Sequence, residues 1–111
     1  MSRQLSVPLR SALVAYREAL QEALPGKVRR LTLFGSMARG QAHEDSDVDI
    51  LVLLDSPTFD DRRRAMDWAT RVGLAHDFIF APVVLSTREW QELIDRERRF
   101  PREVAADGVD L

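Results

Sequence analysis

The chain has 111 residues, of which 45% are hydrophobic and 31% are charged, and its formal net charge is -2. This size and composition are typical of one globular domain, so we expect residues 1–111 to form a single domain. The small net charge argues against generic nucleic-acid binding, and the absence of cysteine excludes disulfide frameworks and thiolate zinc sites. No apolar run approaches the ~20 residues of a membrane span and no signal-peptide core is visible, so we expect a cytoplasmic protein without membrane contact.

The first half of the chain predicts one helix followed by two strands. Apolar residues recur at three- and four-residue spacings over residues 5–24, which indicates an amphipathic helix. Residues 27–35 (KVRRLTLFG) then predict a strand, and residues 47–55 (DVDILVLLD) predict a second one. The near-continuous Val, Ile and Leu content of the second strand is typical of a central strand covered on both faces.

A second helix is predicted after a capping box at residues 58–61, where Thr and Asp are three residues apart. Its inward stripe would be Met66, Ala69 and Val72, and we expect it to stop at Gly73. A glycine is a common residue just beyond a helix C-terminus, because it adopts the left-handed conformation without steric cost.

The rest of the chain predicts a third strand and two more helical segments. Residues 76–86 (HDFIFAPVVLS) form the strand, and Pro82 places it at an edge or a bulge because proline cannot donate to a ladder. A second capping box at residues 86–89 begins a helix that carries Trp90, and residues 101–108 predict one more short helical turn. Alternating helices and strands favour the α/β class, with a small mixed sheet flanked by helices.

Two aspartates stand where the second strand begins. Side chains alternate along a strand, so Asp47 and Asp49 project from one face with Cα atoms about 6.5–7 Å apart. Two ionised carboxylates at that separation repel by about 2–3 kcal/mol at an effective dielectric constant near 20, and a divalent cation would relieve this. Magnesium, which prefers oxygen ligands, fits best, although solvated turn residues ahead of a strand would look the same.

The segment upstream of the pair predicts a phosphate site. Gly35 ends a strand, Ser36 is expected to cap a short helix over residues 37–39, and Gly40 is expected to close it in the left-handed conformation. Such a turn presents backbone N–H groups that attract phosphate.

The two motifs together, GSMARG and SDVDILV, resemble the signature of the DNA polymerase β-like nucleotidyltransferase superfamily in its minimal, stand-alone form. The resemblance implies the nucleotidyltransferase fold, with Gly35 and Ser36 on the nucleoside triphosphate. It also implies that Asp47 and Asp49 ligate two Mg²⁺ ions. The family needs a third carboxylate on a later strand, and Asp77 in AHDFIF matches that setting.

The resemblance further implies transfer of AMP from ATP to a hydroxyl group. Arg39 is a candidate phosphate contact, with a structural salt bridge as the equal alternative. Stand-alone proteins of this type resemble the antitoxin of toxin–antitoxin pairs, whose partner is a HEPN-domain ribonuclease toxin modified on a tyrosine.

The acceptor stays open, because the catalytic fold leaves no segment for a deep acceptor pocket. Recognition would then come from another chain or from homo- or hetero-oligomerisation. Two alternatives remain: an aminoglycoside-type small-molecule nucleotidyltransferase, and an antitoxin that acts by binding alone. Two charge runs, residues 60–67 (DDRRRAMD) and 96–100 (RERRF), are typical of solvated helix faces but could equally face an acidic partner.

Overall fold

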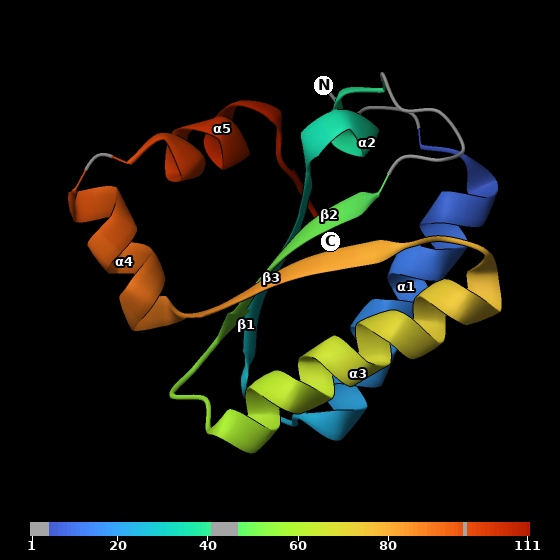
Figure 1. Ribbon diagram of the computed structural model, residues 1–111, viewed down its shortest axis with the longest axis horizontal. Helices are drawn as coiled ribbons and strands as arrows, with labels where there is room; N and C mark the ends of the chain where they lie inside the picture. Colours follow the sequence, from blue (N-terminus) through green and yellow to red (C-terminus); the bar gives the residue numbers. More distant parts are fainter. Residues whose placement is uncertain (1–4, 41–46, 97) are drawn as a thin grey trace.

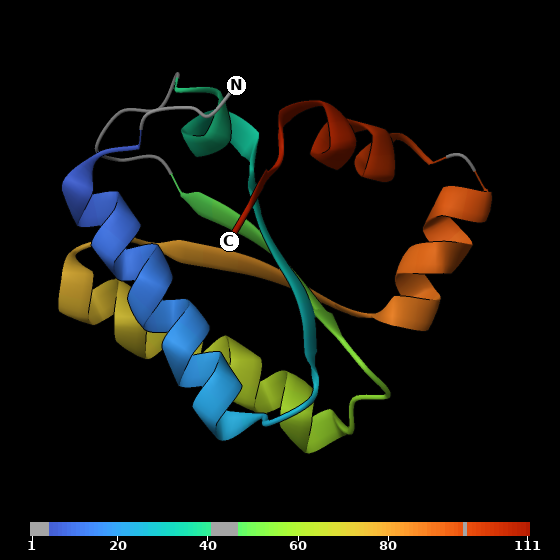
Figure 2. The same cartoon turned by 180° about the vertical axis from the view of Figure 1, so that it is seen from behind.

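The computed structural model describes residues 5–40, 47–96 and 98–111, which build a twisted sheet with helices on either side (Figure 1). The same arrangement is seen from behind in Figure 2, where α1 and α3 again lie together and α4 and α5 lie apart from them. This confirms the predicted α/β class. Within the described ranges no helix is long and apolar enough to cross a bilayer. In chain order the elements are α1 (Val7–Ala23), β1 (Val28–Phe34), α2 (Gly35–Arg39), β2 (Val48–Leu54), α3 (Phe59–His76), β3 (Phe80–Ser86), α4 (Thr87–Asp95), α5 (Arg99–Asp107) and β4 (Val109–Asp110).

The strand order is β3-β2-β1-β4, so β2 has a neighbour on each side and the predicted central strand is confirmed. β1 and β2 are antiparallel, with Phe34 opposite Asp49. β2 and β3 are parallel, with Val48 beside Phe80. Pro82 lies in β3 at the edge of the sheet, as its missing N–H group predicts.

One face of the sheet packs against α1 and α3 and forms the larger core. The strands contribute every second residue to this core, because successive side chains of a strand point to opposite faces of the sheet. The buried sheet residues of this layer are Leu31, Leu33, Val48, Ile50, Val52 and Leu54, and the helices add Leu9, Leu13, Tyr16, Leu20, Ala65, Ala69 and Val72.

The opposite face packs against α4 and α5 in a smaller core. Leu51 and Leu53 of β2 contact this layer, which includes Trp90 of α4 and Val104 of α5. The predicted second capping box begins α4: the Glu89 N–H donates to Ser86 Oγ at 3.0 Å, and the Ser86 N–H donates to Glu89 Oε1 at 2.9 Å. The capping box therefore aims the buried face of α4 at the sheet.

Helix α3 begins as predicted but ends later. The Asp61 N–H donates to Thr58 Oγ1 at 3.0 Å, which confirms the capping box. The expected stop at Gly73 is wrong, because the helix continues to His76. The chain beyond the helix folds back over Gly73, where a Cβ would lie 2.5 Å from the Phe78 carbonyl oxygen. The glycine is required for this close approach and not for ending the helix.

The predicted inward stripe of α3 is confirmed for Ala69 and Val72, which are buried, and is wrong for Met66. Met66 is 47% exposed, whereas Ala65 is fully buried together with Ala69. Ala65 fits because α1 crosses close to α3 there, and the Tyr16 hydroxyl donates to its carbonyl at 2.9 Å. A methionine at that position would be too large for the contact.

Helix α2 is where the short predicted helix lies, but its cap differs. Phe34 is the N-cap and no side chain caps it, so the expectation that Ser36 caps the helix is wrong: Ser36 lies within the first turn. Gly40 adopts a left-handed conformation with φ of 71°, as predicted.

The C-terminal part holds more structure than the single turn predicted at residues 101–108. Helix α5 has nine residues, and β4, which was not predicted, pairs antiparallel with β1 through Thr32 and Asp110. A two-residue strand is too short to produce a periodic pattern in the sequence, so only its tertiary partner reveals it.

Candidate active site

The turn between β1 and α2 lies directly against Asp49. Phe34, the last residue of β1, is the pairing partner of Asp49 in β2, so the next residue, Gly35, is placed beside the carboxylate. Gly35 has φ of 75°, and a Cβ on it would overlap Asp49 Oδ2 and lie 3.1 Å from Asp49 Cγ. The two halves of the sequence motif therefore meet in space at one edge of the sheet.

Asp47 and Asp49 form an electrostatically coupled pair at the start of β2. Val48 is fully buried in the α1–α3 layer, so Asp49 projects from the opposite face, and Asp47 is exposed one residue ahead of the strand. Burial raises the pKa of Asp49, and the Asp47 charge raises it further. A carboxylate whose ionisation is opposed by a neighbouring carboxylate favours a cation beside it.

Arg39, at the end of α2, supplies positive charge to this edge. Its charge lowers the pKa of Asp49 and so opposes the two effects just described. Its Nη1 lies 3.5 Å from Asp107 Oδ2 of α5, which confirms the structural salt bridge and identifies Asp107 as the partner. The proximity of Arg39 to Asp49 leaves its second predicted role, a contact to phosphate, open as well.

Gly35 and Ser36 are the first two residues of α2. Their N–H groups belong to the first turn, where a helix has no carbonyl partner four residues back. These are the groups that the sequence predicted for phosphate, and Ser36 presents its half-buried side chain from the same turn.

Asp77 lies apart from this cluster. It is the exposed C-cap of α3, with φ of 61°, and its N–H donates to the Gly73 carbonyl, so it precedes β3 and does not belong to the strand. The β3 residue beside Asp49 is Ala81, and the Val48 N–H donates to the Ile79 carbonyl at 2.8 Å. In the part of the chain that the structure describes, no group of three His, Cys, Asp or Glu side chains is placed to hold a metal ion.

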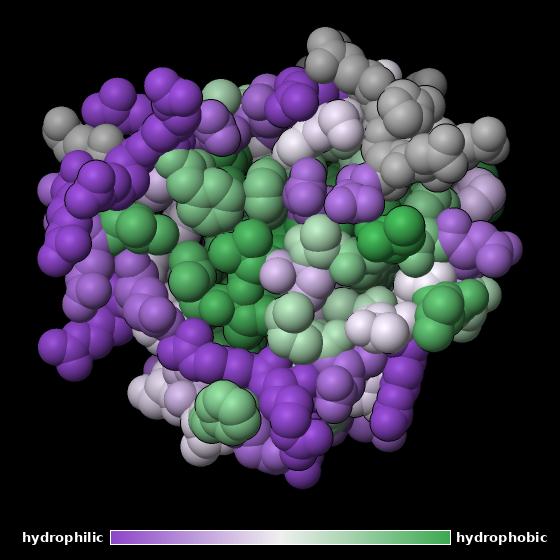
Figure 3. Space-filling view, viewed as in Figure 1, coloured by the Kyte–Doolittle hydropathy of each residue, from purple (hydrophilic) through white to green (hydrophobic). Residues whose placement is uncertain are grey.

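Beside the acidic edge, apolar side chains form an open surface between β3 and the α4–α5 pair (Figure 3). Phe34 and Phe100 meet there edge to face with ring centroids 5.2 Å apart. Val83 and Leu85 of β3 and Leu93 of α4 are also partly buried against the smaller core. No pattern in the sequence singles out Phe100 or Asp107, because both are ordinary positions of a terminal helical segment.

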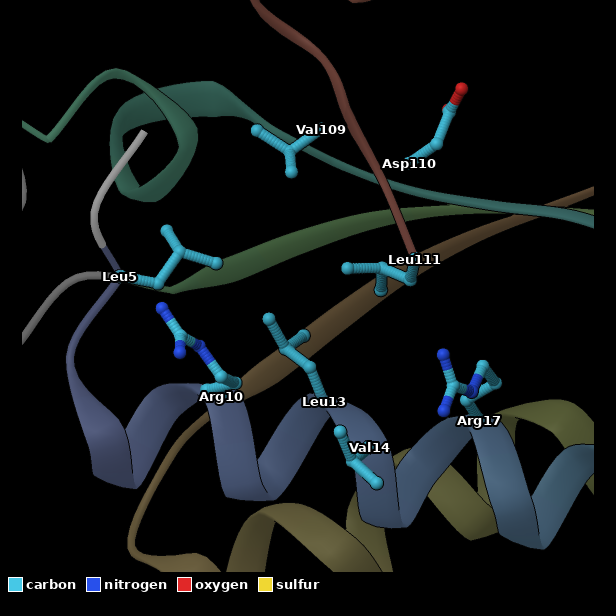
Figure 4. Close-up of a pocket in the computed structure, with 8 residues that line it drawn as sticks. All are labelled: Leu5, Arg10, Leu13, Val14, Arg17, Val109, Asp110 and Leu111. Carbon is cyan, nitrogen blue, oxygen red and sulfur yellow. The ribbon is translucent and has the colours of Figure 1, made fainter. Parts of the chain in front are cut away.

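A separate hollow of about 280 Å³ lies between α1 and β4 (Figure 4). Leu13 and Arg17 face it from α1, and Val109 and Leu111 face it from the C-terminal segment. None of the predicted site residues lines it, so the candidate active site is the acidic edge and its apolar surface.

The donor set at the acidic edge suits a hard divalent cation. Asp47 and Asp49 provide carboxylate oxygens on one side of the sheet, where burial and then the Asp47 charge raise the pKa of Asp49. Mg²⁺ takes few protein carboxylates and completes its coordination with water and substrate phosphate. Asp47 and Asp49 are therefore the residues that could hold it.

Comparisons with known proteins cover most of the chain. The family profile described as "Nucleotidyltransferase domain" matches residues 13–103. A relative from Methanocaldococcus jannaschii, "Putative protein adenylyltransferase MJ0141", is 31% identical over 90 residues, which are 80% of this chain and 91% of the relative.

Two solved structures are similar in fold. One is a crystal structure of an MntA toxin–antitoxin complex, with 25% identity, a TM-score of 0.59, and coverage of 97% of this chain and 72% of the solved chain. The other is a toxin–antitoxin crystal structure with AMP-PNP, with 25% identity, a TM-score of 0.55, and coverage of 86% and 68% of the two chains.

Proposed function

Because this chain belongs to the nucleotidyltransferase domain family, we propose that it is an antitoxin that transfers AMP from ATP to a tyrosine hydroxyl of a HEPN-domain ribonuclease toxin. Its nucleotidyltransferase class follows from the family. The donor, the magnesium requirement and the tyrosine acceptor are the proposed parts, together with a cytoplasmic setting where ATP is available.

The contact between Gly35 and Asp49 is the observation that carries the proposal. It joins the first turn of α2, whose N–H groups have no carbonyl partner within the helix, to a carboxylate that lies beside a second one. A triphosphate needs both, because its oxygens accept hydrogen bonds and its charge requires a counter-ion. Neither half alone would distinguish a nucleotide site from an ordinary turn.

We assign the binding roles as follows. The N–H groups of Gly35 and Ser36 hold the triphosphate, and Arg39 adds a charge-assisted contact. Asp47 and Asp49 would hold Mg²⁺, which in such sites polarises phosphoryl oxygens and offsets the charge of the leaving pyrophosphate. The Phe34 and Phe100 surface gives the base or the acceptor an apolar floor.

The transfer itself is an in-line displacement. The acceptor oxygen forms a bond to the α-phosphorus, the bond from that phosphorus to the bridging oxygen breaks, and pyrophosphate leaves with the bond electrons. The hydroxyl proton must go to a base, and we assign this role to Asp77. Asp77 is the exposed C-cap of α3, so in this proposal it acts on an acceptor that arrives from solution.

A protein acceptor fits the site better than a small molecule. The acidic edge is open, with Asp47 exposed and a broad apolar surface beside it. A small polar acceptor such as an aminoglycoside needs an enclosed, polar second site. The relative named as a protein adenylyltransferase and the toxin–antitoxin complexes of the same fold support this choice.

The test is intact-mass analysis of a HEPN-domain toxin after incubation with this protein, ATP and MgCl₂. The proposal predicts added AMP with the wild type, and none with Asp47→Asn/Asp49→Asn or with EDTA. Toxicity should stay lost after this protein is removed. If the double variant stays folded and neutralises the toxin fully with no mass change in either sample, the protein acts by binding and the catalytic role fails.

A further inference from the structure

A groove of about 370 Å³ lies between α4 and α5 and opens on the sheet face that carries Asp49. Arg30 of β1, which lines it, pairs with Leu53 of β2, and Leu53 shares its face with Asp49 by the alternation of the strand. Arg30 is four residues from Phe34, the pairing partner of Asp49, so the groove begins roughly 13 Å from the aspartate.

The floor of the groove is apolar and well packed. Trp90 is 8% exposed, and Pro101 of α5 is buried beside it. Ile94 of α4 is 42% exposed at the wall of the groove. One apolar side chain from outside would cover Ile94 and fill the space.

The rim of the groove is positive. Arg30, Arg98 and Arg102 line it, and no acidic side chain is among its described lining residues. Arg30 is held over the Trp90 ring at 5.7 Å and bonded to Asp110 at 3.3 Å, so its place is fixed. Arg98 belongs to the charge run 96–100 and is the N-cap of α5, and Arg102 lies one turn further along the helix.

We propose that this groove docks an acidic segment of the acceptor protein, with one apolar side chain on Trp90 and Ile94 and its carboxylates on Arg98 and Arg102. The inference rests on the proposed function for the identity of the acceptor. Helix α5 links the two regions, because its first turn lines the groove and its last residue, Asp107, pairs with Arg39. An acceptor held there would lie on the same sheet face as the aspartate pair.

A single-stranded nucleic acid is a poorer fit. It would need an exposed aromatic face on which a base could stack. The Trp90 ring is already covered by Arg30 at 5.7 Å and by the edge of Phe100, with ring centroids 5.9 Å apart. What remains is a small apolar hollow with positive edges, which suits a side chain flanked by carboxylates.

The first experiment measures binding without nucleotide. Trp90 and Trp68 are the two tryptophans, so in Trp68→Phe the emission reports on Trp90 alone. The probe is a short peptide of Asp, Glu and Ser with one central Phe. We expect saturable quenching of the Trp90 emission by the peptide. Arg98→Glu/Arg102→Glu should lower the affinity for the peptide at least about tenfold. Ala105→Gln should lower it by a similar factor, because the longer side chain fills the groove without changing its charge. Arg71→Glu on α3, where the Arg71 guanidinium lies over the ring at position 68, controls for a charge reversal outside the groove and should have no effect.

Three results would overturn the proposal: equal quenching by a peptide with Ser in place of Phe, equal loss in Arg71→Glu, or tighter binding of a single-stranded RNA of the same length. Self-association that Arg98→Glu/Arg102→Glu abolishes in sedimentation would instead make a second copy the occupant, and would also overturn it.

The second experiment uses the acceptor protein. In the AMP-transfer assay, Arg98→Glu/Arg102→Glu should raise KM for the HEPN toxin about tenfold and leave KM for ATP unchanged. Unchanged KM for the toxin overturns the docking site while leaving the proposed function intact. If no AMP is transferred at all, the proposed function fails. The affinity of the toxin for the wild type and for Arg98→Glu/Arg102→Glu is then compared directly. Equal affinities would overturn the docking site.

Discussion

Gly35 and Asp49 touch across the β1–β2 pair, and the space beside Asp49 is available only because residue 35 has no side chain. The positive φ of Gly35 turns the chain from the strand into α2 at the same point. One residue therefore makes the turn and brings the first turn of α2 against the carboxylate.

Gly35→Ala should abolish nucleotide binding, whereas Gly40→Ala should not. Both glycines have φ near 70°, so alanine carries about the same backbone strain of 1–2 kcal/mol at each. Only at position 35 does the new Cβ overlap Asp49, while nothing lies within 4 Å at position 40. Calorimetry with AMP-PNP and Mg²⁺ compares them, with melting temperatures as the control. Equal affinities in the two variants would show that the contact has no part in nucleotide binding.

Asp49→Asn should stabilise the metal-free protein at neutral pH. Burial and Asp47 raise the pKa of Asp49 in the folded state, so the folded protein binds that proton more tightly than the unfolded chain. The resulting stability is present below the unfolded pKa, near 4, and is lost as the pH rises through the folded pKa. With EDTA at pH 7 we expect the melting temperature to rise by a few degrees, and the gain to vanish near pH 3.

The control for this effect is Asp95→Asn, which changes an exposed carboxylate on α4 that only accepts a bond from Gln91. It should leave the melting temperature unchanged at both pH values. A lower melting temperature for Asp49→Asn, or an equal gain in the control, would contradict the repulsion between Asp47 and Asp49.

Asp77→Asn should slow AMP transfer less than either substitution in the pair. Asp77 is an exposed helix C-cap and is not grouped with Asp47 and Asp49, so it would act on the acceptor proton alone. We expect kcat to fall about tenfold for Asp77→Asn and about 10³-fold for Asp47→Asn, measured under saturating ATP. Asparagine tolerates the left-handed conformation, so the fold should persist. An unchanged kcat would remove Asp77 from the site.

Tyr16→Phe should destabilise the fold without affecting nucleotide binding. The Tyr16 hydroxyl is buried and donates to the Ala65 carbonyl at 2.9 Å, tying α1 to α3 on the face away from Asp49. Losing this bond costs about 1 kcal/mol, or roughly 4–6 °C in melting temperature. Tyr16→Leu should cost more, because it also removes the edge contact with Phe80 at 5.5 Å. A Tyr16→Phe protein as stable as the wild type would show that the bond adds nothing.

The sequence by itself determined the features that depend on neighbours in the chain. Both capping boxes formed as predicted, because each joins residues three apart and needs no distant partner. The central place of β2 followed from its continuous apolar content, since only a strand covered on both faces tolerates it. The Gly-Ser and Asp-x-Asp motif predicted the family because its spacing matches the strand, turn and strand on which the chemistry depends.

Only the tertiary structure decided what depends on distant packing. Gly73 reads as a helix stop, yet the helix continues, because the returning chain at Phe78 needs the space. Asp107 pairs with Arg39 because α5 lies against α2, and no periodic pattern in the sequence predicts such a contact. Asp77 reads as a strand residue but caps α3, since the energy of completing a buried helix outweighs the local strand signal of the following residues. Local patterns are set by backbone geometry over a few residues, whereas these positions are set by which surfaces the folded chain brings together.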